Sequence, residues 1–218
     1  MDVTRTIKML NHYASKKNKE GMAQFGIDTE HALGVSILHI RRVAREIGTN
    51  HELAINLWKT NIHEARILAS IIEDPNKVTS DQMDAWANDF NSWDLCDQCC
   101  MNLFCKTRFA YSKAIIWAEN EKEFVRRAGF VLMAALAVHD KKAEDSRFIH
   151  FFPTIKQYST DERNFVKKAV NWALRQIGKR NNNLRSEAIK VAEEIQNTDS
   201  KDAKWIAFDA LRELKGVR

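Results

Sequence analysis

The first residues that could do chemistry lie between positions 93 and 105. Trp93 and Asp97 are four residues apart, so in a helix they share one side. Asp97 lies beyond the first helical turn, where a carboxylate would interact with the helix dipole. No Lys or Arg occupies position 93, 94, 100 or 101. Neither the helix dipole nor a Lys or Arg at these positions explains the carboxylate of Asp97. Such a carboxylate, next to an aromatic ring, is a candidate catalytic group. Asp94, by contrast, falls in the first turn, and we expect it only to stabilise the helix dipole.

All four cysteines lie in the same segment, at Cys96, Cys99, Cys100 and Cys105. The first two form a C-x-x-C, which suggests a metal site. Zinc sites, however, usually take about four ligands from two such motifs, and no second C-x-x-C or His pair is present. We therefore expect reduced, buried thiols that serve as packing residues, with no metal and no cofactor.

A second group of candidates lies on two later segments. The helix expected over residues 161–179 has an apolar stripe of Val166, Val170, Ala173 and Ile177. Trp172 lies roughly 130° from the centre of that stripe, beside Lys168 and Arg175. Arg127 points away from the apolar stripe of its own helix, expected over residues 122–138, and it occupies the position equivalent to Lys168. Two interpretations of Trp172 stand: a ligand contact, or burial by the next pair of helices.

Positive charge is concentrated in the same region. Residues 146–190 contain ten Lys and Arg against three Asp and Glu, a local net charge of +7, and the whole chain carries +5 at pH 7. A solvated charged face is one explanation. A concave basic stripe that binds phosphates at repeated spacing is the other.

Helical periodicity positions these residues. We expect helices at residues 4–17, 31–47, 51–59, 62–73, 79–90, 93–105, 108–118, 122–138, 145–157, 161–179, 184–196 and 201–214. Seven glycines and two prolines in 218 residues are too few for a turn-dense all-β fold, and too few for a Gly-rich phosphate loop. The sequence therefore predicts an all-α protein.

Internal repeats refine that prediction. Residues 124–128 (FVRRA) match residues 165–169 (FVKKA) at an offset of 41, with a weaker copy at 205–208 and an earlier one at 63–69. A period of about 40 residues that holds two helices is typical of HEAT-like repeats, which stack into a curved solenoid. We predict one all-helical domain over residues 1–218 with a concave basic face; an irregular helical bundle is the alternative.

The lengths of the apolar runs indicate where in the cell the protein is expected. None approaches the ~18 residues of a membrane-spanning helix, and residues 1–10 lack the apolar core of a secretory signal. We expect a monomer without membrane association, cytoplasmic and nucleoid-associated, or nuclear if the source is eukaryotic.

The chain resembles the HEAT-like DNA alkylation repair glycosylases. The resemblance covers nearly the whole chain and is carried by residues 63–66 (HEAR), 91–97 (NSWDLCD), 124–128 (FVRRA) and 171–175 (NWALR). It implies that Asp97 is the catalytic carboxylate and that Trp93 and Trp172 are the tryptophans of the site. It also implies that Arg127 contacts a phosphate near the lesion.

The resemblance also implies a reaction. Members of this family excise purines alkylated at N3 or N7, such as 3-methyladenine and 7-methylguanine, so the expected partner is double-stranded DNA that contains alkylated bases. Lys168 and Arg175, beside Trp172, are expected to bind the DNA backbone. The alternatives are a non-catalytic HEAT-like protein that binds DNA structures and a protein-binding scaffold.

Overall fold

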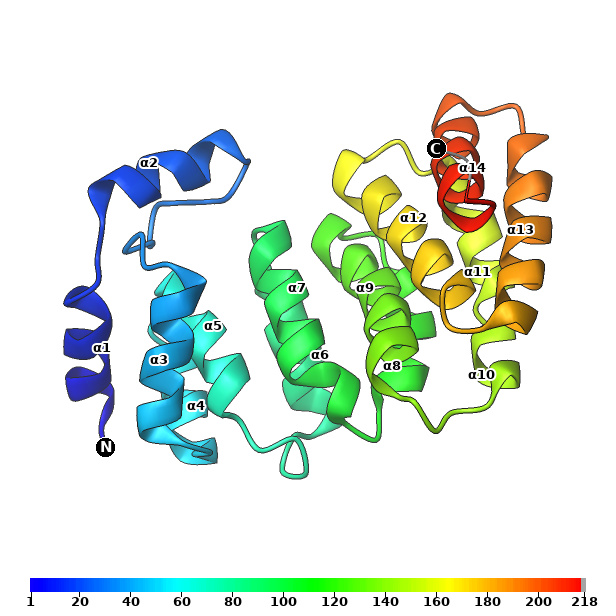
Figure 1. Ribbon diagram of the computed structural model, residues 1–218. Coiled ribbons are helices and arrows are strands. Elements are labelled where there is room, and N and C mark those ends of the chain that lie inside the picture. Colours follow the sequence, from blue (N-terminus) through cyan, green and yellow to red (C-terminus); the bar gives the residue numbers. More distant parts are fainter. Residues whose placement is uncertain (217–218) are drawn as a thin grey trace. The chain divides into compact units, whose positions relative to one another are not determined.

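The computed structural model describes residues 1–216, and over these residues it contains helices and no strand (Figure 1). The all-α prediction is confirmed. Tertiary contacts divide the chain into two compact units, Met1–Thr107 and Arg108–Arg218, which we describe separately. The prediction of a single domain stays a prediction. No helix within residues 1–216 is long and apolar enough to span a membrane.

The first unit contains seven α-helices and a short 3-10 helix. They are α1 (Val3–Asn11), α2 (Lys16–Gln24), α3 (Ile37–Ile47), α4 (His51–Trp58), α5 (His63–Ile72), α6 (Ser80–Asn88), α7 (Trp93–Asn102) and η1 (Phe104–Lys106). In chain order, α3 packs on α5 and α5 packs on α7. The helix expected over residues 4–17 is two helices, because Ser15 caps α2 by accepting a hydrogen bond from the amide of Asn18.

The helix expected from residue 31 begins only at Ile37, because a buried carboxylate holds the preceding loop extended. Glu64, 1% exposed, accepts hydrogen bonds from the backbone amides of Leu33, Gly34 and Val35 at 2.7–3.1 Å. Gly34 has a φ of +76°, and a Cβ there would lie 2.1 Å from the carbonyl oxygen of Ser15. A glycine is therefore required at this turn.

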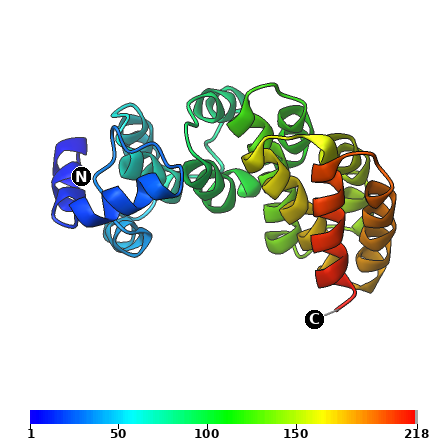
Figure 2. The ribbon, with the colours of Figure 1, turned by 90° about the horizontal axis from the view of Figure 1, so that it is seen from above.

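The second unit contains seven further α-helices and a second 3-10 helix. They are α8 (Ala110–Ala118), α9 (Glu123–His139), α10 (Asp145–Ile149), α11 (Phe152–Gln157), η2 (Tyr158–Thr160), α12 (Asn164–Gly178), α13 (Asn182–Gln196) and α14 (Lys201–Leu214). The helix expected over residues 145–157 is broken into α10 and α11, since Pro153 occupies the first turn of α11 and cannot continue a preceding helix. Figure 2 shows α12, α14 and α13 side by side.

The core of the second unit is α9, which packs against both α8 and α12. Every residue from Arg127 to Ala137 is buried. At Gly129 a Cβ would lie 2.3 Å from the backbone nitrogen of Ala118, so the absence of a side chain allows α8 and α9 to cross closely.

The predicted repeat is visible as equivalent contacts between successive helices. The rings of Phe124 and Phe165, equivalent residues of α9 and α12, lie 5.6 Å apart between centroids. Arg126 pairs with Asp161 at 2.7 Å, and one repeat later Lys167 pairs with Asp202, also at 2.7 Å. Both members of the pair are thus displaced by 41 residues, as the sequence repeat predicts.

Candidate functional site

The structure places Trp93 and Asp97 on one side of α7. Trp93 is the first residue of the helix, Asp97 lies one turn later, and both are partly exposed. The Nε1 of Trp93 donates a hydrogen bond to the backbone carbonyl of Phe25 at 3.0 Å, which holds the indole against the segment after α2. The pair lies on one side of a single helix, as its spacing predicts, and its role in catalysis stays a prediction.

The buried side of α7, which Trp93 and Asp97 flank, carries Cys96, Cys99 and Cys100, and Cys105 follows on η1. Cys96, Cys99 and Cys100 are completely buried, Cys105 is 9% exposed, and none of the four forms a disulfide. Desolvation raises the pKa of Cys99 and Cys100 well above the ordinary value and raises that of Cys105 to about 11. Cys99, Cys100 and Cys105 are therefore protonated at neutral pH, and all four cysteines are packing residues, as predicted. Within residues 1–216, no three His, Cys, Asp or Glu side chains gather where they could hold a metal ion.

The first turn of α7 holds a second carboxylate, Asp94, whose oxygen lies 2.8 Å from Nε2 of His63 on α5. His63 is 4% exposed. Burial lowers the pKa of His63, but the hydrogen bond and charge of Asp94 outweigh it, so the pKa is raised. Burial likewise raises the pKa of Asp94, and His63 more than reverses this. The prediction that Asp94 serves only the helix dipole is wrong, because it forms a buried ion pair between α5 and α7.

Arg127 departs from its predicted orientation. It was expected to point away from the core of α9, but it is 6% exposed, because α12 covers that side of the helix. Its Nη1 donates a hydrogen bond to the backbone carbonyl of Phe165 at 2.6 Å, which ties α9 to the first turn of α12. The side chain thus has a structural role, and its contact with a phosphate stays a prediction.

Trp172 and Lys168 both lie off the core stripe of α12, as predicted. Trp172 is partly exposed rather than covered by the next pair of helices. With the amide of Gln176 turned so that its oxygen faces the indole, that oxygen accepts a hydrogen bond from Trp172 Nε1 at 3.1 Å. Lys168 is exposed, and the described part of the chain offers it no ion pair. These two side chains are accessible on one helix face.

Most other cations of the basic segment are neutralised. Arg175 pairs with both Asp209 and Glu213 of α14, and Lys179 also pairs with Glu213, at 2.7 Å. Burial raises the pKa of Glu213, but these two cations lower it overall. Because the acidic partners lie beyond residue 190, the count over 146–190 overstated the free positive charge. Pairing with α14 accounts for Arg175 without DNA, so the DNA contact predicted for Arg175 has no support from this geometry.

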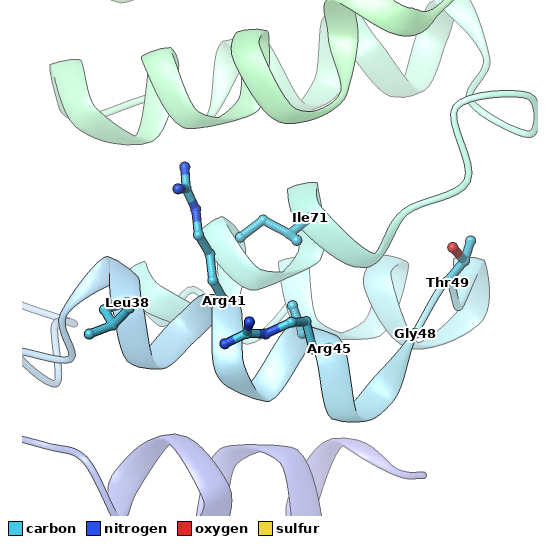
Figure 3. A pocket seen from close by; sticks show the side chains of 7 residues that line it. Leu38, Arg41, Arg45, Gly48, Thr49 and Ile71 are labelled. Carbon is cyan, nitrogen blue, oxygen red and sulfur yellow. The ribbon is translucent and has the colours of Figure 1, made fainter.

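The structure also reveals two cations that sequence reasoning missed. A groove of about 450 Å³ in the first unit is lined by Leu38, Arg41, Ala44, Arg45, Gly48, Thr49 and Ile71. Figure 3 shows Arg41 and Arg45 projecting from α3 and Ile71 from α5. Both arginines are exposed and have no ion pair among the described residues. Arg41 and Arg45 are four residues apart, about one helical turn, and this spacing could have identified them in the sequence as a pair of cations on one helix face.

The candidate residues therefore fall into two groups. Trp93 and Asp97 lie together on α7 of the first unit, whereas Arg127, Lys168 and Trp172 lie on the adjacent helices α9 and α12 of the second. That both groups act on one substrate stays a prediction.

Comparison with known proteins decides the family. The model of the DNA alkylation repair enzyme family matches residues 6–214. The chain belongs to that family. No curated protein matches this family member. A solved structure described as "a new family of proteins related to the HEAT-like repeat DNA glycosylases with affinity for branched DNA structures" is similar to it, with a TM-score of 0.80 and 20% sequence identity. The match covers 97% of this chain and 95% of that chain, and it confirms the HEAT-like fold.

Proposed function

We propose that this member of the DNA alkylation repair family is a DNA glycosylase that excises cationic N3- or N7-alkylated purines from duplex DNA. The observation that carries the proposal is the family match over residues 6–214, combined with the placement of Trp93 and Asp97 one turn apart on α7. The family indicates alkylated DNA as the substrate. The pair on α7 supplies groups suited to the chemistry.

The chemistry requires little from the protein. A purine alkylated at N3 or N7 carries a positive charge and leaves the sugar as a neutral base, so no general acid has to protonate it. Glycosidases that act on poorer leaving groups use two carboxyl groups, one of them protonated. Asp94, next to Asp97 along α7, has a lowered pKa and holds no proton at neutral pH. This constellation therefore suits a leaving group that is already cationic.

Asp97 supplies the negative charge. As the glycosidic bond breaks, the sugar develops oxocarbenium character, and a carboxylate held on a rigid helix stabilises that charge and orients the attacking water. The indole of Trp93, fixed by Phe25, adds the attraction of its π face for a cation. Trp172 contributes a second partly exposed indole of the same kind.

Cations on both units then hold the DNA backbone. In the second unit Lys168 is exposed for such a contact, and Arg127 contacts a phosphate near the lesion. In the first unit the exposed Arg41 and Arg45 contact further phosphates. Such contacts fix the position of the duplex without reading its sequence.

A second candidate function is non-catalytic recognition of DNA structure. It is favoured by the similarity to a solved structure whose description names affinity for branched DNA. In that case the protein would bind DNA with strong salt dependence but release no base.

The deciding experiment is incubation of the purified protein with methylated duplex DNA, followed by chromatography of the released bases. We expect free 7-methylguanine or 3-methyladenine, and little release of uracil or 8-oxoguanine from matched duplexes, because those neutral bases are poor leaving groups. Tight binding without release of any alkylated base would favour the second candidate. Efficient release of uracil would refute the leaving-group argument.

A further inference from the structure

The helix α14 presents an unusual exposed face. Trp205 is 42% exposed and Phe208 is 62% exposed, although large aromatic side chains are normally covered. At 100° per residue these two rings lie with three exposed cations inside an arc of about 100°. The cations are Lys201, Lys204 and Arg212. No Asp or Glu of the helix falls inside this arc.

The acidic residues of α14 occupy a different side. Asp202, Asp209 and Glu213 are paired with Lys167 and Arg175 of α12. The negative charge of the helix is therefore used within the fold, whereas the rings and cations remain outside. We call Lys201, Lys204, Trp205, Phe208 and Arg212 the α14 stripe.

Two cations of the α14 stripe also form ion pairs at the surface. Lys204 lies 3.5 Å from Asp199, and Arg212 pairs with Asp209 three residues earlier. The lysine and arginine side chains remain 55% and 56% exposed. The Lys204–Asp199 pair is exposed on both sides and is therefore weak, and Asp209 keeps Arg175 as a partner when Arg212 turns to a phosphate.

The repeat register places the α14 stripe on the same face as the site residues of α12. At an offset of 40, Lys168 corresponds to Phe208 and Trp172 corresponds to Arg212. The two helices pack side by side (Figure 2), and Lys167 of α12 lies over the ring of Trp205, 5.3 Å from its centroid. The stripe thus extends the proposed DNA-binding face of α12 by one repeat.

We propose that the α14 stripe is a stacking platform for unpaired bases, so that the protein binds a duplex joined to a single-stranded segment better than the duplex alone. The inference rests on the proposed DNA-binding function and specifies a further part of its ligand. Exposed aromatic rings stack on bases of any sequence, and interleaved Lys and Arg side chains hold the phosphates between them. Bases inside a duplex are already stacked, so only unpaired bases reach the platform. The clustered cations favour a polyanion over an apolar protein surface as the occupant.

The test compares three unmethylated ligands with the full chain: a blunt duplex, the same duplex with a thymine tail, and the same duplex with an abasic tail. The abasic tail has the phosphates of the thymine tail but no bases. We expect the thymine tail to bind about 10-fold more tightly than the abasic tail, the scale of one or two stacked bases. Trp205→Ala and Phe208→Ala should each remove most of that preference, whereas Trp205→Phe should retain it.

Ile116→Ala is the matched control, because Ile116 is an exposed apolar residue of the same unit, 57% exposed, on α8. It should leave the preference unchanged, and thermal melts should show all four variants folded. Equal binding of the thymine and abasic tails overturns the proposed platform. An undiminished preference in both Trp205→Ala and Phe208→Ala overturns it as well. Concentration-dependent dimerisation that Trp205→Ala abolishes also overturns it, because the stripe would then bind a second copy. Base release from methylated blunt duplex, measured in parallel, reports on the proposed function independently.

Discussion

His63 of α5 and Asp94 of α7 form a buried ion pair, with 2.8 Å between His63 Nε2 and the Asp94 carboxylate. The pair anchors the first turn of α7, which carries Trp93 and, one turn later, Asp97. Neither residue of the pair needs to touch the substrate to matter, because the direction of α7 sets the position of both candidate groups.

Asp94→Asn should therefore cost about 3 kcal/mol in the free energy of unfolding, because it leaves His63 buried without its charged partner. Denaturant titration measures this loss. Asp81→Asn is the control: Asp81 lies in the first turn of α6 and is exposed, so its loss should cost about 0.3 kcal/mol. Equal losses of unfolding free energy in the two variants would show that the His63–Asp94 ion pair does not stabilise the fold.

The contribution of this pair should depend on pH in a defined window. The pKa of His63 is raised above its ordinary 6.5, so its stabilisation is complete below that pH and is lost as the pH rises through the raised value. The pKa of Asp94 is lowered below 3.8, so its stabilisation is present above that pH and is lost as the pH falls through the lowered value. The stability difference between the wild type and Asp94→Asn should thus be largest between 3.8 and 6.5 and decline on both sides. A difference that is constant from acid to alkaline pH would contradict this.

Asp97→Asn should retain the fold and the affinity for DNA but lose about 10²-fold or more in the rate of base excision, the usual effect of removing a preorganised charge. Single-turnover release of 7-methylguanine measures the rate, and fluorescence anisotropy measures binding. A rate within a few-fold of the wild type would exclude Asp97 as the carboxylate that stabilises the sugar cation.

Trp172→Ala should lower excision about 10-fold through the loss of packing and π-face attraction of about 1–2 kcal/mol. Its thermal stability should change much less than that of Val170→Ala, because Val170 is fully buried in the same helix and Trp172 is not. The slope of binding against salt should not change, since an indole displaces no counterion. A large loss of stability with unchanged chemistry per folded molecule would remove Trp172 from the site.

Lys168 and Arg175, neighbours on α12, should behave differently. Lys168→Ala should reduce the salt slope of DNA binding by about one unit, because one phosphate contact is lost. Arg175→Ala should leave that slope unchanged and destabilise the fold instead, because Asp209 and Glu213 each lose the cation that ties α14 to α12 and keep only Arg212 and Lys179, respectively. Binding isotherms at several salt concentrations, with melts of both variants, distinguish these effects. A salt slope reduced equally in the two variants would show that Arg175 also contacts a phosphate.

The sequence predicted what depends on local periodicity. The fully buried Val166, Val170, Ala173 and Ile177 form the stripe expected for α12. The repeat of FVRRA as FVKKA produces equivalent ring and ion-pair contacts. The helix α2 was missed because it buries no residue and so has no apolar stripe to detect.

What the sequence could not predict are partners that are distant along the chain. The partner of Asp94 lies 31 residues earlier, and that of Arg175 lies 38 residues later. Helical angles separate a core side from an outer side, but they do not say which outer positions the next repeat covers. Arg127 was misjudged for that reason, since α12 buries it.

The repeated ion pairs of the second unit impose an order on its maturation during protein synthesis. Arg126 and Lys167 each precede their acidic partners by 35 residues. A ribosome that adds about 5–20 residues per second therefore exposes each cation for roughly 2–7 seconds before its carboxylate is made. Arg126 of α9 and Lys167 of α12 stay without these carboxylates until the following segment has been translated. The cation of α9 therefore gains its carboxylate only when the segment just before α12 has been made, and the cation of α12 gains its carboxylate only when α14 emerges.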